Sequence, residues 1–278
     1  MKLYRTQTGA LLNADGKMYT LPVADWETFI NDDDIYNTLT SLLTSGKVTA
    51  APGLPADALL PPIGPRQELW ACGVTYWRSK VGRQEESKAS GGGDFYEKVY
   101  HAERPEVFFK STPGRVSGPG QPVRIRKDST WDVPEPELTL VVTASGKIIG
   151  YTIGNDMSSR SIEGENPLYL PQAKTYDGCA ALGPCIYVTN APLPARALIR
   201  LTINRNGQTA FTGDVELAQM KRSPEELVSF VYRESSFPHG CLIMTGTGIV
   251  PGNDFTLQSG DEISIGIDGI GTLTNTVA

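Results

Sequence analysis

The stretch WDVPEPELTLVVTASGKIIGYTIGND, at residues 131–156, predicts a β-hairpin that carries three carboxylates. Two runs rich in apolar and β-branched residues predict antiparallel strands, and the run ASGK at 144–147 predicts the turn between them. A turn centred in this run pairs Glu135 with Asp156 across the hairpin. Side chains two residues apart share a face of a strand, so Glu137 points the same way as Glu135. We therefore expect the three carboxylates to converge at one end of the hairpin.

Three carboxylates this close together predict a cation site. Directly opposed residues of a hairpin have Cβ atoms about 4.5–5.5 Å apart, so the carboxylates would repel one another strongly without a positive charge between them. Mg²⁺, Mn²⁺ or Ca²⁺ fits an all-oxygen ligand set better than zinc does, and leaves positions open for water or substrate. The alternative is a solvated acidic patch at a strand end, because Glu-x-Glu is a weak pattern by itself.

The composition is that of an ordinary globular protein and limits the possible partners. The 278 residues include 31 acidic and 25 basic side chains, with a formal net charge of −6. This acidic balance argues against nucleic acid as a partner. The amino terminus lacks an apolar signal core and no apolar run is long enough to cross a membrane, so we expect a cytoplasmic protein with no membrane partner. The four cysteines lie far apart and are expected to be buried free thiols.

The order of elements predicts an α+β fold that is mostly β. Residues 1–65 predict a small N-terminal α/β unit followed by a proline-rich linker. Residues 66–278 predict a larger domain in which short strand-like runs outnumber helical stretches. In the N-terminal unit we expect strands at 1–6 and 17–21 and a helical stretch at 25–43 that is interrupted at 31–34. In the larger domain we expect helices at 78–87, 95–102 and 224–233, the last capped by Ser223, and a strand at 122–127 among others.

Three further motifs follow the Glu-x-Glu in order: GYTIGNDMSSRSIEG at 150–164, AKTYDGCAALGPCI at 173–186 and LIMTGTGIV at 242–250. Together with the Glu-x-Glu they resemble the fumarylacetoacetate hydrolase superfamily over roughly residues 68–278. The resemblance implies a fumarylacetoacetate hydrolase-like mixed β-roll with a divalent cation at its mouth. It also implies a small 2-keto acid as substrate and a homodimer or homotetramer.

The resemblance assigns roles to individual residues. It makes Glu135, Glu137 and Asp156 the metal ligands, and Lys174 matches a lysine beside the metal. The loop at 245–247 matches one that receives a substrate carboxylate or ketone. The residues expected to contact substrate are Arg78, Ser79, Lys110, Arg160, Thr245, Gly246 and Thr247.

One departure from the superfamily pattern bears on the reaction. Hydrolases of the superfamily commonly carry a His-x-x-Glu dyad that activates water, and Ser79 and Gly82 stand at the corresponding positions here. The segments GVTYWRS and RPEVFFK resemble instead the branch that dehydrates 2-keto-3-deoxy sugar acids, which makes Glu106 and Lys174 the expected acid/base pair. Glu106 precedes Lys110 by four residues, so both are expected on one face of a strand. Lys174 would act as a base only with a lowered pKa.

The resemblance to this branch implies dehydration of a 2-keto-3-deoxypentonate, through an enolate that the cation stabilises. Three alternatives remain open. A hydrolase would cleave an acylpyruvate or a fumarylacetoacetate-like diketo acid, with Glu85 or Glu86 as a substitute base. An isomerase or decarboxylase of dienoate diacids would need enolate stabilisation alone. A binding protein would keep the fold without catalysis.

Overall fold

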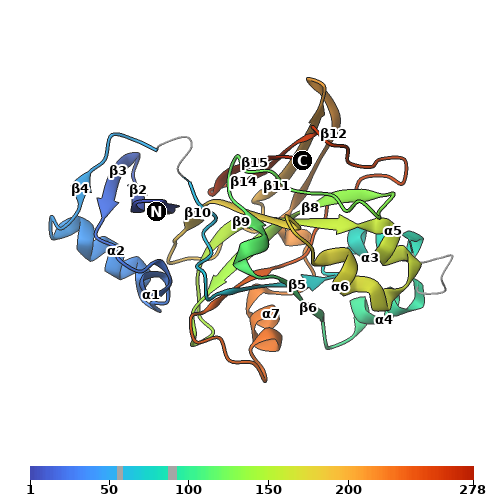
Figure 1. The fold of residues 1–278 in the computed structure, drawn as a ribbon. Coiled ribbons are helices and arrows are strands. Elements are labelled where there is room, and N and C mark those ends of the chain that lie inside the picture. The colour runs from blue at the N-terminus through green and yellow to red at the C-terminus, as the bar shows by residue number, and fades with distance from the viewer. Residues whose placement is uncertain (55–58, 87–92) are drawn as a thin grey trace.

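The computed structural model describes residues 1–54, 59–86 and 93–278, and its centre is a large mixed sheet (Figure 1). This sheet has eleven strands in the order β4-β3-β2-β1-β10-β9-β8-β13-β5-β6, with β7 paired to β10. Its strands are β1 (Lys2–Thr6), β2 (Gly9–Ala14), β3 (Lys17–Leu21), β4 (Thr49–Ala50), β5 (Glu68–Gly73), β6 (Glu106–Ser111), β7 (Val116–Ser117), β8 (Asp132–Val142), β9 (Ile148–Ser159), β10 (Ala180–Tyr187) and β13 (Cys241–Met244).

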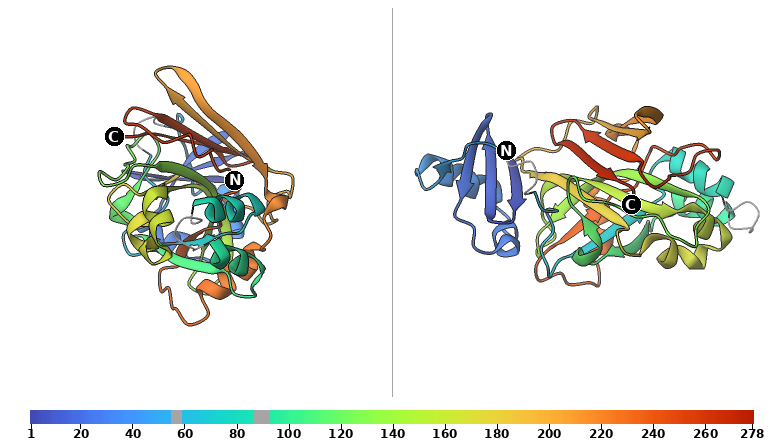
Figure 2. Two further views of the ribbon diagram at one scale, coloured as in Figure 1. Left: turned by 90° about the vertical axis from the view of Figure 1, so that its right-hand side faces the viewer. Right: turned by 45° about the horizontal axis from the view of Figure 1, so that its top comes forward.

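A second, four-stranded sheet packs on the first (Figure 2). It consists of β12 (Gln208–Glu216), β11 (Leu198–Arg205), β14 (Glu262–Ile267) and β15 (Gly271–Thr276), in that spatial order. Leu140 and Ile153 of the first sheet and Leu201 and Ile265 of the second belong to one buried apolar cluster. Burial of this shared core holds the two sheets together. The predicted fold, α+β and mostly β, is confirmed.

Four of the helices gather at the end of the molecule opposite the N-terminal unit (Figure 1). These are α3 (Trp77–Glu86), α4 (Gly93–His101), α5 (Arg160–Glu165) and α6 (Leu170–Lys174). The other α-helices of the described residues are α1 (Trp26–Ile30), α2 (Ile35–Thr44) and α7 (Pro224–Val231). The Ser223 hydroxyl accepts a hydrogen bond from the Glu226 N–H, which confirms the predicted cap of α7. Within the described ranges, no helix is long and apolar enough to cross a membrane.

The β8–β9 hairpin confirms the predicted register, because Glu135 lies opposite Asp156. The pairing beside the turn differs from the prediction by one residue, since Val142 pairs with Ile148 and not with Ile149. A bulge next to this pair restores the expected register from Val141 onward. The prediction was therefore correct at the carboxylates although the turn differs in detail.

The carboxylate end of β8 has one neighbouring strand fewer than the rest. Strand β13 pairs with β8 only over 139–142, so the part of β8 before Leu138 has β9 as its ladder partner. Pro134 and Pro136 lie in this part, as expected for residues that cannot donate to a second ladder. The backbone thus leaves one side of this end free for the loop that follows β13.

The N-terminal unit contains a strand that the sequence did not predict. Strand β2 follows β1 after only Gln7 and Thr8, which lack the Asn-Gly or Asp-Gly composition of recognisable tight turns. The predicted interruption of the helical stretch is confirmed by the break between α1 and α2. Strand β1 pairs with β10, so the large sheet runs through this unit. The division at residue 65 stays a prediction.

Other predictions for the larger domain had mixed outcomes. The strand expected at 122–127 is wrong, because in that range only Val123 forms a bridge, to Val277. Arg126 instead binds the carboxylate of Asp128 and the carbonyl of Gln172. The four cysteines are buried free thiols, as predicted. The last residue of the helix expected at 78–87 lies outside the described residues, as does part of the linker.

Candidate active site

The three predicted carboxylates converge. Glu135 and Glu137 of β8 and Asp156 of β9 offer ligand atoms that lie within 4.8 Å of one another. Each of these residues is at most 4% exposed. Burial raises the pKa of Glu137 well above its ordinary value, and repulsion from Asp156 and Glu135 raises it further. Such a buried, all-oxygen, mutually repelling set fits a hard divalent cation, and the alternative of a solvated acidic patch is excluded.

Lys174, the last residue of α6, lies against two of these carboxylates. Its Nζ is 2.5 Å from Oε2 of Glu135, 2.9 Å from Oδ2 of Asp156 and 2.6 Å from Oγ of Ser158. Burial lowers the pKa of Lys174, but the charges of Asp156, Glu135 and Glu163 outweigh it and leave this pKa above its ordinary value. These contacts place Lys174 to orient the two carboxylates.

Lys110 lies behind Asp156. Its fully buried Nζ is 2.6 Å from Oδ1 of Asp156 and 3.1 Å from the carbonyl of Met157. The register of β6 against β5 breaks between Ser111 and Phe109, which leaves Lys110 as a bulged residue. The expected simple alternation of Glu106 and Lys110 on one strand face is thus interrupted, and Lys110 supports a ligand instead of lining a cavity.

A second layer of charges surrounds Glu135. Arg160 Nη2 is 2.7 Å from Glu135 Oε1, and Arg160 Nη1 is 3.5 Å from Glu163 Oε2. Arg83 of α3 forms an ion pair with Glu163 of α5. Burial raises the pKa of Glu135, but the charges of Lys174, Arg160 and Arg83 hold it below its ordinary value. Arg160 is thus placed to hold Glu135, although it was expected to contact substrate.

Sequence reasoning missed Arg83 and Glu163. Both are nearly fully buried, and their ion pair joins two helices that are distant in the chain. A short helix of mainly polar residues shows no apolar periodicity that would mark an arginine as buried. Its partner, Glu163, lies 80 positions away, so local spacing does not reveal the ion pair either. The one available indication was the position of Glu163 within the motif at 150–164.

The loop at 245–247 reaches the triad through its backbone. The Gly246 N–H donates to Oε2 of Glu137 at 2.5 Å. Gly246 has φ +91°, and a Cβ there would meet Oγ1 of Thr75, so glycine is required. The hydroxyls of Thr245 and Thr247 donate to the carbonyls of Leu138 and Ile249. Gly246 and Thr247 line a small pocket over the triad, whereas Thr245 does not.

The two residues predicted on α3 have different positions. Ser79 lines the same small pocket, and its hydroxyl donates to the Tyr76 carbonyl at 2.8 Å. Arg78 is exposed and does not line this pocket. The structure therefore brings Ser79 to the triad and leaves Arg78 outside. The side chains of Glu85 and Glu86 lie outside the described residues.

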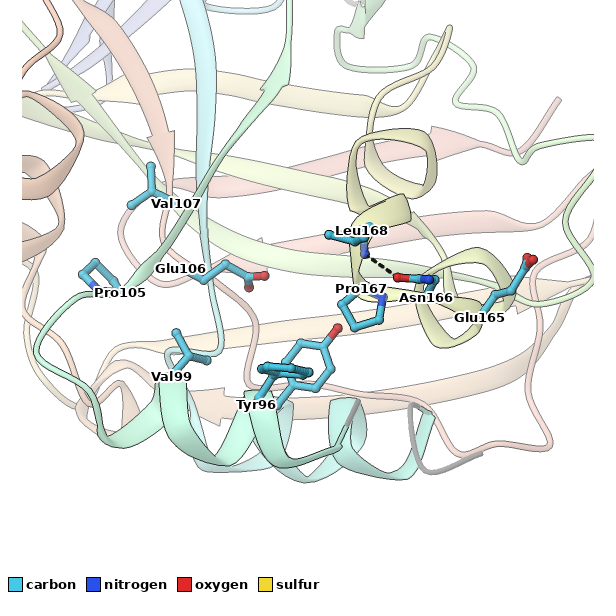
Figure 3. Close-up of a pocket in the computed structure, with 10 residues that line it drawn as sticks. Tyr96, Val99, Pro105, Glu106, Val107, Glu165, Asn166, Pro167 and Leu168 are labelled. Carbon is cyan, nitrogen blue, oxygen red and sulfur yellow. Dashed lines mark hydrogen bonds between the residues drawn. The ribbon is translucent and has the colours of Figure 1, made fainter. Parts of the chain in front are cut away.

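Glu106 lines one cavity and lies against Gly73, which lines another. The pocket over the triad has a volume of about 10 Å³, and its wall includes Gly73, Arg83 and Phe108. A larger cavity of about 730 Å³ is lined by Glu106 together with Tyr96 and Pro167 (Figure 3). A Cβ on Gly73 would overlap Oε2 of Glu106 and lie 2.8 Å from its Cδ. The carboxyl group of Glu106 thus occupies the space above Gly73, between the triad and the larger cavity.

Glu106 has the environment of an acid/base group. Burial raises its pKa above the ordinary value, and the charge of Arg83 opposes this rise. Its Oε2 is buried and accepts no hydrogen bond from the described part of the chain. A buried carboxyl group with a raised pKa beside a cation site is a candidate for proton transfer to and from a substrate.

Comparison with known proteins places the chain among characterised families. Residues 76–278 match the family model described as "Fumarylacetoacetate (FAA) hydrolase C-terminal". The chain is 50% identical over 212 residues to a "Probable 2-keto-3-deoxyxylonate dehydratase" of Haloferax volcanii, covering 76% of this chain and 72% of that one. It is 45% identical over 218 residues to the "2-dehydro-3-deoxy-D-arabinonate dehydratase" of Saccharolobus solfataricus, covering 78% and 73%.

A solved structure is similar over nearly the whole length. It is described as "2-keto-3-deoxy-D-arabinonate dehydratase complexed with magnesium and 2,5-dioxopentanoate". Its TM-score is 0.82 and its identity 35%, and the match covers 100% of this chain and 98% of that one.

Proposed function

The chain belongs to the fumarylacetoacetate hydrolase family, and we propose that it is a Mg²⁺-dependent hydro-lyase that dehydrates a 2-keto-3-deoxypentonate. The observation that carries the proposal is the position of Glu106, a buried carboxyl group between the carboxylate triad and the larger cavity. The two curated relatives described above and the similar solved structure support it, because each is described as a dehydratase of this substrate class.

The triad and its supporting charges have a binding role. Glu135, Glu137 and Asp156 would hold the cation, with Mg²⁺ as the first choice and Mn²⁺ or Ca²⁺ as substitutes. When bound, the cation would polarise the 2-keto group of the substrate and make its C3 proton more acidic. Lys174 and the Gly246 N–H fix the carboxylates in place.

Glu106 is the proposed acid/base group for both proton transfers. Its ionised carboxylate accepts the C3 proton, and the resulting carboxylic acid returns this proton to the departing C4 hydroxyl, which leaves as water. One residue suffices because the proton taken from C3 is the proton needed at C4, and burial, which raises the pKa of Glu106, favours the protonated form that returns it. Lys174 is not assigned a proton transfer, since two carboxylates and Ser158 Oγ hold its ammonium group.

Hydrolysis of a C–C bond is the less favoured function. The Ser79 hydroxyl, at the position of the expected histidine, is bound to the Tyr76 carbonyl. In the described structure no histidine lines the small pocket, so the water-activating dyad has no counterpart there. A small 2-keto acid as substrate, a cytoplasmic location and a homodimeric or homotetrameric assembly belong to the same proposal.

Exchange of the C3 protons tests the proposed chemistry without dehydration. 2-Oxopentanoate has no C4 hydroxyl to lose, so it should exchange its C3 protons with D₂O only when protein and Mg²⁺ are both present. Proton NMR measures this exchange. Equal exchange after chelation of the cation would contradict the proposal.

Gly73→Ala is expected to lower kcat by about 100-fold, because a misplacement of a catalytic group by about 1 Å has effects of this size. The backbone of Gly73 does not have a positive φ, so alanine should disturb the carboxyl group of Glu106 and not the fold. Steady-state kinetics measures the change, and calorimetry should show unchanged Mg²⁺ affinity. Gly114→Ala is the matched control, since a Cβ there meets nothing within 4 Å. Equal kcat values for both variants would refute the placement of Glu106.

A further inference from the structure

Two arginines five residues apart on α3 have opposite environments. Arg78 is exposed, whereas Arg83 is 4% exposed and lines the small pocket over the triad. Ser79, one turn before Arg83, lines the same pocket. Residues four apart lie on one helical face, so α3 directs the face with Ser79 and Arg83 toward the triad.

The contacts of Arg83 place its guanidinium between the triad and the larger cavity. Its Nη2 is 4.0 Å from Oε1 of Glu135, and its Cζ is 5.8 Å from the ring of Tyr96. Tyr96 lines the larger cavity together with Glu106 (Figure 3). The charge of Arg83 is also the largest electrostatic influence that lowers the pKa of Glu106. Arg83 is therefore close to both the cation site and the acid/base group.

The chemistry of the substrate class indicates what this guanidinium meets. A 2-keto acid whose carboxylate and keto oxygens face the triad has its C4 two bonds beyond the keto carbon, in the direction of Glu106. An oxygen on C4 would then lie next to Arg83. We propose that Arg83 donates a hydrogen bond to the C4 hydroxyl of a bound 4-hydroxy-2-oxo acid, and that Glu163 holds the guanidinium in position. This inference rests on the proposed function, because it takes the substrate from it.

The negative charge of Glu163 is balanced by other cations besides Arg83. Glu163 has two other cations nearby, Arg160 Nη1 at 3.5 Å and Lys174 Nζ at 3.5 Å. A guanidinium presents several donors in a fixed plane, so Arg83 is able to bind Glu163 and a ligand at the same time. Its ion pair with Glu163 is nearly fully buried, which limits the orientations of the side chain.

A pair of ligands that differ only in the C4 hydroxyl tests the inference. 4-Hydroxy-2-oxopentanoate and 2-oxopentanoate are titrated calorimetrically into Mg²⁺-loaded protein that carries Glu106→Gln, so that neither is consumed. A hydrogen bond from a charged donor predicts a preference of about 10- to 100-fold for the hydroxylated ligand. Adding Arg83→Met should abolish this preference and leave the affinity for 2-oxopentanoate within about threefold. Equal weakening of both ligands would overturn the inference, because it would indicate a general electrostatic or structural role.

Two further variants keep the test decisive. Arg83→Lys retains the positive charge beside Glu163 and should fold, but it loses the planar donor group, so the preference should fall by about tenfold. If Arg83→Met does not fold, this variant carries the test, and an unchanged preference would refute the role of Arg83. Arg78→Met, on the exposed face of the same helix, should keep the full preference, and its loss there would transfer the role to Arg78.

The test separates failure of this inference from failure of the proposed function. The ligand preference is a binding measurement and needs no turnover. If the unsubstituted protein leaves 2-keto-3-deoxypentonates unchanged, the proposed function is refuted, whatever preference for the hydroxylated ligand is measured. If the unsubstituted protein dehydrates these sugar acids but the Arg83→Met variant keeps the preference for the hydroxylated ligand, only the inference about Arg83 is refuted.

Discussion

Glu137→Gln is expected to lower cation-dependent turnover by about 1,000-fold. The substitution removes one charged ligand from the triad, and the stabilisation by a Lewis-acid cation corresponds to several kcal/mol of the barrier. The Gly246 N–H still has an oxygen to bind, because glutamine retains an acceptor at this position. Steady-state kinetics at increasing Mg²⁺ concentration measures the loss, and calorimetry measures the cation affinity.

The same variant should leave the metal-free protein at least as stable as the unsubstituted one. In the absence of a cation, Glu137 is repelled by Asp156 and Glu135, and a neutral side chain removes this repulsion. Glu135→Gln is the matched comparison, since it should lose turnover equally but lower the free energy of unfolding by about 3–5 kcal/mol, because it removes the buried charge that Lys174 and Arg160 share. Full turnover in either variant would refute the metal site.

Glu106→Gln is expected to lower kcat by about 100- to 10,000-fold, the range of general acid–base catalysis. Glutamine fits the same space above Gly73 but neither accepts nor returns the C3 proton. The affinity for Mg²⁺ should not change, because Glu106 is not a member of the triad. Glu165→Gln is the control: Glu165 lines the same cavity, but its carboxylate is directed away from Glu106 (Figure 3).

The pH dependence gives an independent check on Glu106. Its pKa is raised above the ordinary value of a glutamate, mainly by burial. The ionised form that accepts the C3 proton is therefore lost as the pH falls through this raised pKa. The kcat/KM of the unsubstituted protein should decline at a higher pH than an exposed glutamate would allow, and the residual activity of Glu106→Gln should lack this decline. An identical acid limb in both proteins would assign it to another group.

The sequence was sufficient to predict the triad because a hairpin has few degrees of freedom. Alternation along β8 determines that Glu135 and Glu137 share a face, and the register across the turn determines that Asp156 lies opposite. The bulge beside the turn could not be predicted, since the same residues allow turns of two lengths. The error remained local because the bulge restored the register.

The surrounding charges were less predictable because they depend on helix packing. Lys174 was identified only through its motif, and its contacts with Glu135 and Asp156 depend on where α6 meets the hairpin. On α3, the sequence could not distinguish Arg78 from Arg83, because an isolated short helix of mainly polar residues has no clear buried face. The structure distinguishes them by burial.

The most direct test of the proposed function is mass spectrometry of the products formed from a 2-keto-3-deoxypentonate with purified, Mg²⁺-loaded protein. The proposal predicts a product lighter than the substrate by one water, formed with Mg²⁺ and absent after chelation. An acylpyruvate incubated in parallel should remain intact. Cleavage of the acylpyruvate into pyruvate and a second acid, with the sugar acid unchanged, would contradict the proposal and indicate a hydrolase.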